Sequence, residues 1–462
     1  MIFSGIAFIY VFLPCVVAVY FAVPKRLKNC VLLLSGLVFY AWGEPKYVFL
    51  MLLAIVLNYI CGLIIGRNIS GITAKVTLVF SVTANLSMLG YFKYAGFFAE
   101  NFNRLFGTDT AVLKIALPVG ISFYTFQILS YVVDVYRGDV PAQKNIINFG
   151  AYVVMFPQLV AGPIVRYSDI NKALVSRTHS LQKASDGVRR FAVGLAKKVI
   201  VADSFGVLCE AFKSSDDMSL AFYWLYAISF TLQIYYDFSG YSDMAVGLGK
   251  IFGFDFPENF DYPYISRSVT EFWRRWHRSL GTWFKDYLYI PLGGSRTTAL
   301  KRIRNILVVW LATGFWHGAE WNFLLWGLYF AVLLIIEKMW LYKKLEKSVI
   351  LSRIYLLFIV VIGFVIFNAE SMAEISENIS AMFGAVDIPF VSDSFFYYLK
   401  SYGILLITAV VGSTPVIKKI AVKISNHSIS NVAEPVFVAV LLIASTAFIV
   451  DSSFSPFLYF RF

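Results

Sequence analysis

Charged residues are scarce in this sequence, and their scarcity excludes an ordinary water-soluble fold. Only 15% of the 462 residues are Asp, Glu, Lys or Arg, whereas soluble domains carry about 25%. Hydrophobic residues make up 59% of the chain, and the mean hydropathy is +0.70. This balance predicts an all-α, polytopic membrane protein, because helices satisfy their backbone hydrogen bonds internally in lipid. We interpret residues 1–462 as one transmembrane domain of about 11–12 helices plus re-entrant segments.

Cysteine and histidine are also rare, with four residues of each type. The cysteines form no Cys-x-x-Cys pair, and we interpret them as packing residues. No His/Cys cluster has zinc spacing, and neither a Walker motif nor a strand-to-helix Gly-x-Gly-x-x-Gly is present. A Gly-x-Ser-x-Gly nucleophile elbow is absent too. The sequence therefore predicts no metal site and no bound cofactor.

Long apolar runs are abundant. A helix that crosses the hydrocarbon core of a bilayer needs roughly 20 apolar residues. The clear candidates are Ile6–Val23, Tyr47–Ile65, Val76–Phe92, Trp224–Tyr236, Phe323–Leu341, Tyr355–Phe367, Gly403–Val416 and Val436–Ile449. Ala111–Val135 is a more polar candidate. Phe149–Gly162 lies between two basic stretches and contains Pro157, which interrupts a helix, so it is predicted to form a re-entrant hairpin.

Basic residues exceed acidic ones by 40 to 28, which gives a net charge of +12. Most lie in short loops between apolar runs, where the positive-inside rule predicts them. We therefore interpret the excess of basic residues as a determinant of membrane topology. We expect the protein to contact the lipid bilayer and to have no nucleic-acid partner. The basic stretch Arg267–Arg304 is expected to face the cytoplasm and both chain ends the outside, in a multi-pass protein of the cytoplasmic (inner) membrane.

His317 is the first candidate for chemistry. It follows an apolar run and lies beside Trp316, three residues before Glu320. An ionisable group next to lipid-facing helices costs free energy and so suggests function. Histidine is also well suited to take a hydroxyl proton near neutral pH. We predict that His317 is a catalytic base; the alternative is a helix-end histidine anchored at the membrane interface.

His277 lies in a basic and aromatic cluster, Glu271–Arg278. Two interpretations stay open for it: an amphipathic helix resting on anionic lipid, or a cationic mouth for a phosphate-bearing donor, since Arg suits phosphate. The other histidines, His179 and His427, fall in polar loops and are interpreted as surface residues. The polar segment Tyr235–Asp243 places carboxylates and hydroxyls at the end of a predicted apolar helix.

Several short segments of the sequence resemble motifs of the membrane-bound O-acyltransferase family, and within it most closely those of the membrane subunits that O-acetylate bacterial alginate. The similar strings are Pro118–Tyr124, Phe156–Ile164, Phe272–His277, Pro291–Arg296, Trp316–Asn322 and Phe457–Phe462. The resemblance covers essentially the whole chain.

The resemblance implies a helical bundle around a polar channel, with catalytic His317 and a second, inner histidine at His277. An acetyl thioester such as acetyl-CoA would enter from the cytoplasm as the donor substrate. The acceptor would be an extracytoplasmic polysaccharide, reached through an SGNH-hydrolase-like partner protein. The candidate donor-binding and channel residues are Trp273, Arg274, Arg275, Trp276, Arg278, Trp316, Asn322, Asp237, Ser239 and Tyr241. Asn322 or a backbone N–H near Gly318 could stabilise the oxyanion.

Tyr459 is a candidate acyl relay. A base inside a channel cannot meet a polysaccharide held by a separate protein, so an intermediate carrier is needed. A phenol with a pKa of about 10 needs a base to attack and leaves readily as a phenolate. The alternative is that the aromatic tail Phe457–Phe462 is an interfacial anchor.

Three other functions stay open at this point. D-Alanyl transfer to teichoic acid is second, because the continuation Ala319–Asn322 after the His-Gly pair is absent from that branch of the family. A polysaccharide transporter or flippase and a non-catalytic scaffold are the remaining alternatives.

Overall fold

The computed structural model describes all residues except 1–2, 113–114, 160–161, 426–429, 452–457 and 459–462. The described residues form helices and connecting turns and no strand, which confirms the all-α prediction. The chain divides into two compact units, one of Met1–Phe191 with Ser242–Glu258 and one of Ala192–Tyr241 with Asn259–Phe462. Each unit is described by itself. The interpretation as a single domain stays a prediction.

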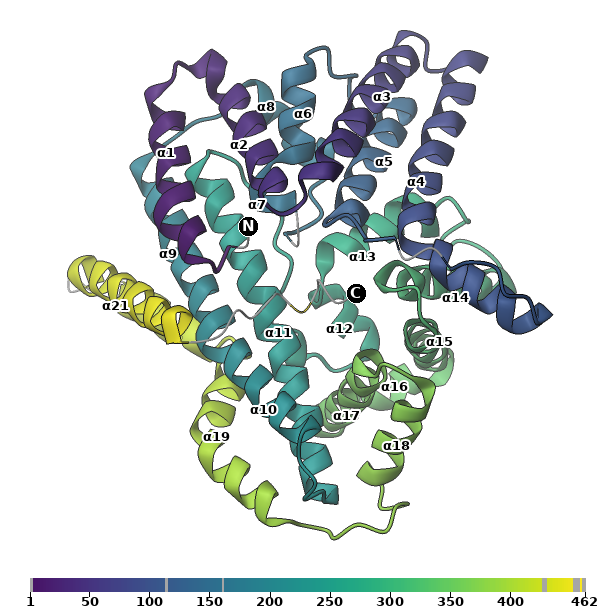
Figure 1. Ribbon diagram of the computed structural model, residues 1–462, viewed down its shortest axis with the longest axis vertical. Coiled ribbons are helices and arrows are strands. Elements are labelled where there is room, and N and C mark those ends of the chain that lie inside the picture. Colours follow the sequence, from purple (N-terminus) through teal and green to yellow (C-terminus); the bar gives the residue numbers. More distant parts are fainter. Residues whose placement is uncertain (1–2, 113–114, 160–161, 426–429, 452–457, 459–462) are drawn as a thin grey trace. The chain divides into compact units, whose positions relative to one another are not determined.

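Unit 1 contains the N-terminal helices. Its long helices α3, α4 and α5 pack against one another, and α2 packs on α6 (Figure 1). The helices are α1 (Leu13–Ala22), α2 (Lys28–Gly43), α3 (Val48–Arg67), α4 (Ile72–Phe106), α5 (Ile121–Arg137), α6 (Ile146–Val154), α7 (Phe156–Leu159), α8 (Tyr167–Val175) and the first part of α9 (Leu181–Ala196).

Unit 2 contains the remaining helices. They are α10 (Asp203–Lys213), the first part of α11 (Leu220–Ile251), α12 (Val269–Arg275), α13 (Arg278–Phe284), α14 (Ala299–His317), α15 (Trp321–Ile336), α16 (Tyr342–Leu345), α17 (Val349–Asn368), α18 (Met372–Met382), α19 (Asp393–Gly412), α20 (Val416–Ser425) and α21 (Ser430–Asp451). Three π-helical turns extend helices of this unit: η4 (Lys197–Ala202), η6 (Lys285–Tyr289) and η7 (Glu337–Leu341).

Six helical segments of the described chain are long and apolar enough to cross a membrane. They are Pro45–Arg67, Ile72–Phe106, Trp321–Leu345, Val349–Asn368, Asp393–Gly412 and Val432–Asp451. Each overlaps one of the apolar runs found in the sequence. The protein is therefore a polytopic helical membrane protein, as predicted.

Two predicted runs differ in detail. Of the described residues in Ala111–Val135, only those from Ile121 onward are helical, because Pro118 and the left-handed Gly120 (φ +76°) form the turn that begins α5. Phe149–Gly162 is interrupted as predicted, but the break falls at Met155, between α6 and α7, before Pro157. Residues 160–161 lie outside the described part of this segment.

His179 is not the surface residue that its polar loop suggested. Within unit 1 its side chain is half-buried, and its Nε2 lies 3.0 Å from the hydroxyl of Tyr20. Arg177 donates to the same hydroxyl from Nε over 2.8 Å. The loop packs because these hydrogen bonds satisfy its polar groups, which sequence polarity alone does not reveal. His427 lies outside the described residues.

The hairpin of α14 and α15 positions the end of α14. The two helices approach closely at Gly314, where an added Cβ would lie 2.2 Å from the Phe323 carbonyl oxygen. At Gly327 an added Cβ would likewise lie 2.4 Å from the Trp310 carbonyl oxygen on α14. Small residues let helix backbones meet at such distances. His317 lies at the turn of this hairpin, because α14 ends at His317 and α15 begins at Trp321.

Candidate active site

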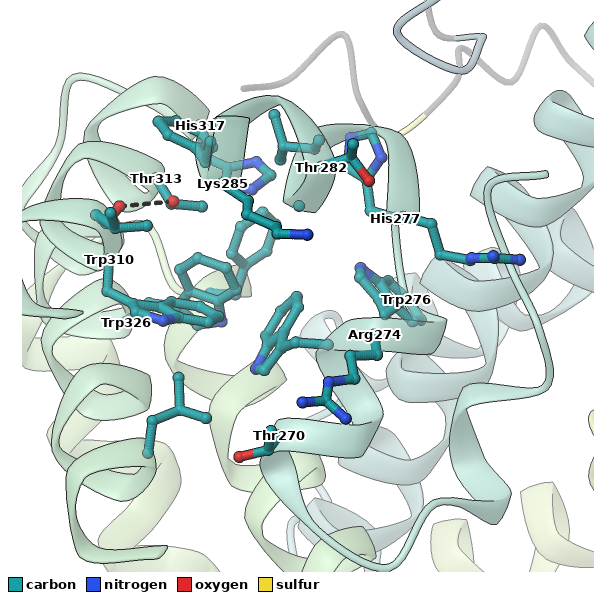
Figure 2. Close-up of a pocket in the computed structure, with 18 of the residues that line it drawn as sticks. Thr270, Arg274, Trp276, His277, Thr282, Lys285, Trp310, Thr313, His317 and Trp326 are labelled. Atoms are coloured by element: carbon teal, nitrogen blue, oxygen red, sulfur yellow. Dashed lines mark hydrogen bonds between the residues drawn. The ribbon is translucent and has the colours of Figure 1, made fainter. Parts of the chain in front are cut away.

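Unit 2 encloses a cavity of about 660 Å³. Helices α12 and α13 line one side of it, and α14 and α15 line another (Figure 2). Of the predicted site residues, the cavity wall brings together Asp237, Trp273, Arg274, Trp276, His277, Arg278 and His317. The segments that supply these residues are separated by more than 30 positions in the chain, so only the fold brings them together.

His317 is the last residue of α14, and only 8% of it is exposed. Its ring lies 5.2 Å, centroid to centroid, from the rings of both Trp326 and Phe367, edge to face in each case. This aromatic packing holds the imidazole at the cavity wall. His317 is therefore largely buried at the end of α14, among aromatic rings.

His277 lies between α12 and α13 with a left-handed backbone (φ +43°) and is buried. Its Nδ1 lies 3.0 Å from Oδ1 of Asn259. Burial lowers the pKa of His277 to about 3, so the ring is neutral at physiological pH. Asn259 has no sequence signature and was missed by the sequence analysis.

One indole contacts both histidines. The Trp316 ring centroid lies 5.0 Å from that of His317 and 6.2 Å from that of His277. Trp316 is buried and is not among the described lining residues of the cavity.

The predicted arginine cluster divides in two. Arg274 and Arg278 line the cavity, whereas Arg275 ion-pairs with Glu271 (2.9 Å) and Asp261 (3.1 Å). Arg275 is not among the cavity-lining residues of the described chain. Figure 2 shows Arg274 and Thr270 near one end of the cavity, with His317 toward the other.

Two lysines complete the cationic lining, and the sequence analysis missed both. Lys285 lies on η6, and Lys338 lies on η7. π-Helical turns are rare in proteins overall, and those that occur are often at functional sites. Residue types do not reveal where such a turn will form. The cations of the cavity suit an anionic group of a bound substrate.

Indoles form much of the wall between these cations and the histidines. The ring of Trp273 packs edge to face on Trp310 (4.8 Å) and Trp326 (5.4 Å). Trp276 packs on Phe364 at 5.1 Å. The lining is therefore mostly apolar with a few polar groups, as is usual for a small-molecule site.

Asp237 also lines the cavity, and it is almost completely buried. Its carboxylate ion-pairs with Lys198 over 2.8 Å and accepts a hydrogen bond of 2.9 Å from the backbone N–H of Leu458. Leu458 is a lining residue too. The neighbouring candidates Ser239 and Tyr241 are buried, but neither appears in the described lining. Tyr459 lies outside the described residues.

Asn322 is used structurally. Its Nδ2 donates to the carbonyl oxygens of Ala369 (2.7 Å) and Phe367 (3.3 Å), which ties the start of α15 to the end of α17. These two bonds occupy the N–H groups that an oxyanion stabiliser would need. Within the described ranges, no three His, Cys, Asp or Glu side chains converge as metal ligands would.

The chain is similar in sequence to several known proteins. Residues 140–369 match the model of the membrane-bound O-acyltransferase family. A probable alginate O-acetylase of Azotobacter vinelandii is 43% identical over 84% of this chain and 79% of its own. A peptidoglycan O-acetyltransferase of Helicobacter pylori is 34% identical over 73% of this chain and 70% of its own. A teichoic acid D-alanyltransferase of Streptococcus thermophilus is 29% identical over 49% of this chain and 58% of its own.

The family resemblance inferred from the motifs is thus confirmed. The matched region contains both histidines, the arginine cluster and the hairpin of α14 and α15. By its identity to relatives over more than two thirds of their length, the chain belongs to the membrane-bound O-acyltransferase family and is a multi-pass membrane O-acyltransferase.

Proposed function

We propose that this protein takes an acetyl group from a cytoplasmic acetyl thioester and passes it across the cytoplasmic membrane for O-acetylation of an extracytoplasmic polysaccharide. The observation that carries the proposal is the single cavity that His317 and His277 share with Arg274 and Arg278. An imidazole and a group of cations in one mostly apolar cavity match the needs of ester formation from an anionic activated donor.

In the proposed chemistry His317 is the general base. It takes the proton of an attacking hydroxyl, the hydroxyl oxygen bonds to the thioester carbonyl carbon, and the C–S bond then breaks. The proton passes from the imidazolium to the departing thiolate, so the histidine returns to its neutral form. A positioned base of this kind contributes about 10²- to 10⁴-fold to rate.

The donor is proposed to be acetyl-CoA or another acetyl thioester, with no resident cofactor. Its phosphates would meet Arg274 and Arg278, with Lys285 and Lys338 nearby in the cavity lining. Arg275 is a weaker candidate for this contact, because its guanidinium already pairs with two carboxylates.

Tyr459 remains the proposed acyl relay. The contact between Leu458 and Asp237 supports it, since it holds the residue next to Tyr459 at the cavity that contains His317. The phenol oxygen would accept the acetyl group and lose its proton to His317. The resulting aryl ester would then discharge to an SGNH-hydrolase-like partner that holds the glycan.

The acceptor is proposed as a glycan class: an alginate-like or other exopolysaccharide, or a cell-wall glycan. The greater identity to the alginate and peptidoglycan acetylating relatives favours acetyl transfer. D-Alanyl transfer to teichoic acid is the second candidate and has weaker support, at 29% identity over half the chain.

The decisive experiment is the variant His317→Ala, tested in membranes that contain the partner protein and the glycan. We expect glycan acetylation to fall by at least about 100-fold at an unchanged membrane protein level. His179→Gln is the matched control, because His179 is not among the described cavity-lining residues. Retained acetylation in His317→Ala would refute the base assignment. Lost glycan export with retained acetylation would indicate a transport role.

Tyr459→Phe tests the relay separately. It keeps the aromatic ring and removes only the hydroxyl. Loss of acetylation at a normal protein level and with normal partner binding would support the relay. Full acetylation would leave the tail as an anchor.

A further inference from the structure

The side chain of Asn259 holds the segment that carries His277. Asn259 is 1% exposed, and its Oδ1 lies 3.0 Å from Nδ1 of His277. The same oxygen accepts hydrogen bonds from the backbone N–H of Ser279 (3.3 Å) and from the Ser279 hydroxyl (2.9 Å). The Asn259 backbone carbonyl accepts a fourth, from the N–H of Arg278 over 2.9 Å.

The backbone N–H of Ser279 determines which way the Asn259 amide points. A backbone N–H can only donate, so the atom that faces it must be the oxygen and not the NH₂ group. Since an amide oxygen only accepts, the His277 nitrogen beside it must carry a hydrogen. His277 therefore has its proton on Nδ1.

The Ser279 hydroxyl does not change this assignment. It lies 3.5 Å from Nδ1 of His277 but only 2.9 Å from the Asn259 oxygen. Its single hydrogen points to the oxygen of Asn259, so it is not available to donate to Nδ1.

The second ring nitrogen of His277 is thus a hydrogen-bond acceptor. The ring is buried, and it packs edge to face on Phe238 at 4.6 Å. Burial favours the neutral form of the ring, and in that form Nε2 carries a lone pair. Within the described part of the chain Nε2 is buried and has no hydrogen-bond partner, although the residue lines the cavity.

The backbone at His277 supports a functional reason for this arrangement. Its φ of +43° lies in the left-handed region, which costs a non-glycine residue free energy and is common at active sites. The turn is held by the bond from Arg278 to Asn259 and by the N–H of Gly281, which donates to the His277 carbonyl over 3.1 Å.

We propose that Asn259 is a positioning residue that fixes His277 in the Nδ1–H tautomer, so that Nε2 keeps its lone pair and His277 stays a neutral side chain beside the cavity. This inference deepens the proposed function and rests on it for the role of the cavity. It divides the work between the histidines: His317 exchanges protons, whereas His277 does not act as a cation.

The tautomer is tested by nitrogen NMR on protein labelled with ¹⁵N-histidine, with His277→Gln used to assign the resonances. We expect a protonated-type Nδ1 and an unprotonated-type Nε2 for His277 near pH 7. Asn259→Asp keeps the acceptor oxygen and should keep the hydrogen on Nδ1. Ser279→Ala should keep it too, because the Asn259–His277 contact is intact. Asn259→Leu should mix the two tautomers.

A hydrogen on Nε2 in the wild-type protein, or an unchanged pattern in Asn259→Leu, would overturn the proposal. These spectra do not depend on acetyl transfer, so they separate a failure of the tautomer assignment from a failure of the proposed function.

The contribution of Asn259 to acetyl transfer is tested by kinetics with acetyl-CoA. Loss of one hydrogen bond between uncharged groups predicts a kcat/KM lowered about 3- to 10-fold in Asn259→Leu. Asn259→Asp keeps the acceptor oxygen and should stay closer to the wild-type value. The double variant Asn259→Leu/His277→Gln should be no worse than His277→Gln alone, because Asn259 acts through His277. Additive losses would assign Asn259 a purely structural role.

Discussion

The backbone N–H of Leu458 donates to the Oδ2 atom of Asp237 over 2.9 Å, across 221 positions of the chain. The same carboxylate pairs with Lys198, which is 4% exposed, and both Asp237 and Leu458 line the cavity of His317. A charged acceptor makes this hydrogen bond stronger than one between neutral groups. A residue next to the proposed relay is thereby attached to the wall of the candidate active site.

Asp237→Asn should weaken this attachment. The variant keeps the shape of the side chain but removes the charge, and a hydrogen bond to a charged group is worth about 1.5–3 kcal/mol. We expect faster digestion of the C-terminus by carboxypeptidase and a lower rate of glycan acetylation. Asp203→Asn is the matched control, because Asp203 also pairs with Lys198 (2.6 Å) but leaves the Leu458 bond intact. Equal digestion of both variants would show that Asp237 does not hold the tail.

Lys198 should be important for stability. Removing the cation in Lys198→Met leaves the buried Asp237 carboxylate without its partner, which costs about 3–5 kcal/mol. The thermal unfolding midpoint in detergent should fall accordingly, and it should fall less in the neighbouring variant Lys197→Met. Because the double variant Lys198→Met/Asp237→Asn also removes the charge of Asp237, the more deeply buried of the two carboxylates that pair with Lys198, part of the stability should return. No recovery in the double variant would contradict this account.

The arginines of α12 should separate in donor kinetics. Arg274 lines the cavity and is exposed to solvent, so its removal in Arg274→Ala should raise KM for the acetyl donor by about 10-fold. Arg275→Ala should leave that KM within about twofold, because Arg275 pairs with Glu271 and Asp261 instead. The measurement is the initial rate of acetyl transfer against donor concentration. A larger KM effect at Arg275 than at Arg274 would refute the cavity assignment.

The pH dependence of stability should report on His277. Its folded-state pKa is about 3, against an ordinary value of 6.5. Below pH 6.5 the unfolded chain binds a proton that the folded ring does not bind, so stability falls as the pH falls from 6.5 toward 3. At pH 5 the loss from this residue is about 2 kcal/mol.

His277→Gln should remove that contribution. We expect its unfolding midpoint to change less than that of the wild-type protein between pH 7.5 and pH 5, measured in the same detergent. His179→Gln controls for loss of a histidine outside the described cavity lining. An equal pH response in His277→Gln and wild type would mean that His277 is not buried in its neutral form.

Much of the architecture was predictable because helices form locally. An apolar run satisfies its own backbone hydrogen bonds within four residues, so Tyr47–Ile65 and Tyr355–Phe367 could be recognised without the fold. His317 was predictable for a similar reason, since the Trp-His-Gly sequence ends an apolar helix. The start of α5 was predicted ten residues too early. The apolar residues before Pro118 were included in the predicted run, although the turn at Gly120 comes before the helix.

Composition and long apolar runs determined that this chain is a helical membrane protein, and the resemblance of its motifs indicated the membrane-bound O-acyltransferase family and the two histidines to consider. The tertiary structure decided which neighbours share a site. It separated Arg274 from Arg275, used both N–H groups of Asn322 on backbone carbonyls, and placed Asn259 beside His277. These relationships depend on side-chain direction and on packing between distant segments, which composition and local periodicity do not encode.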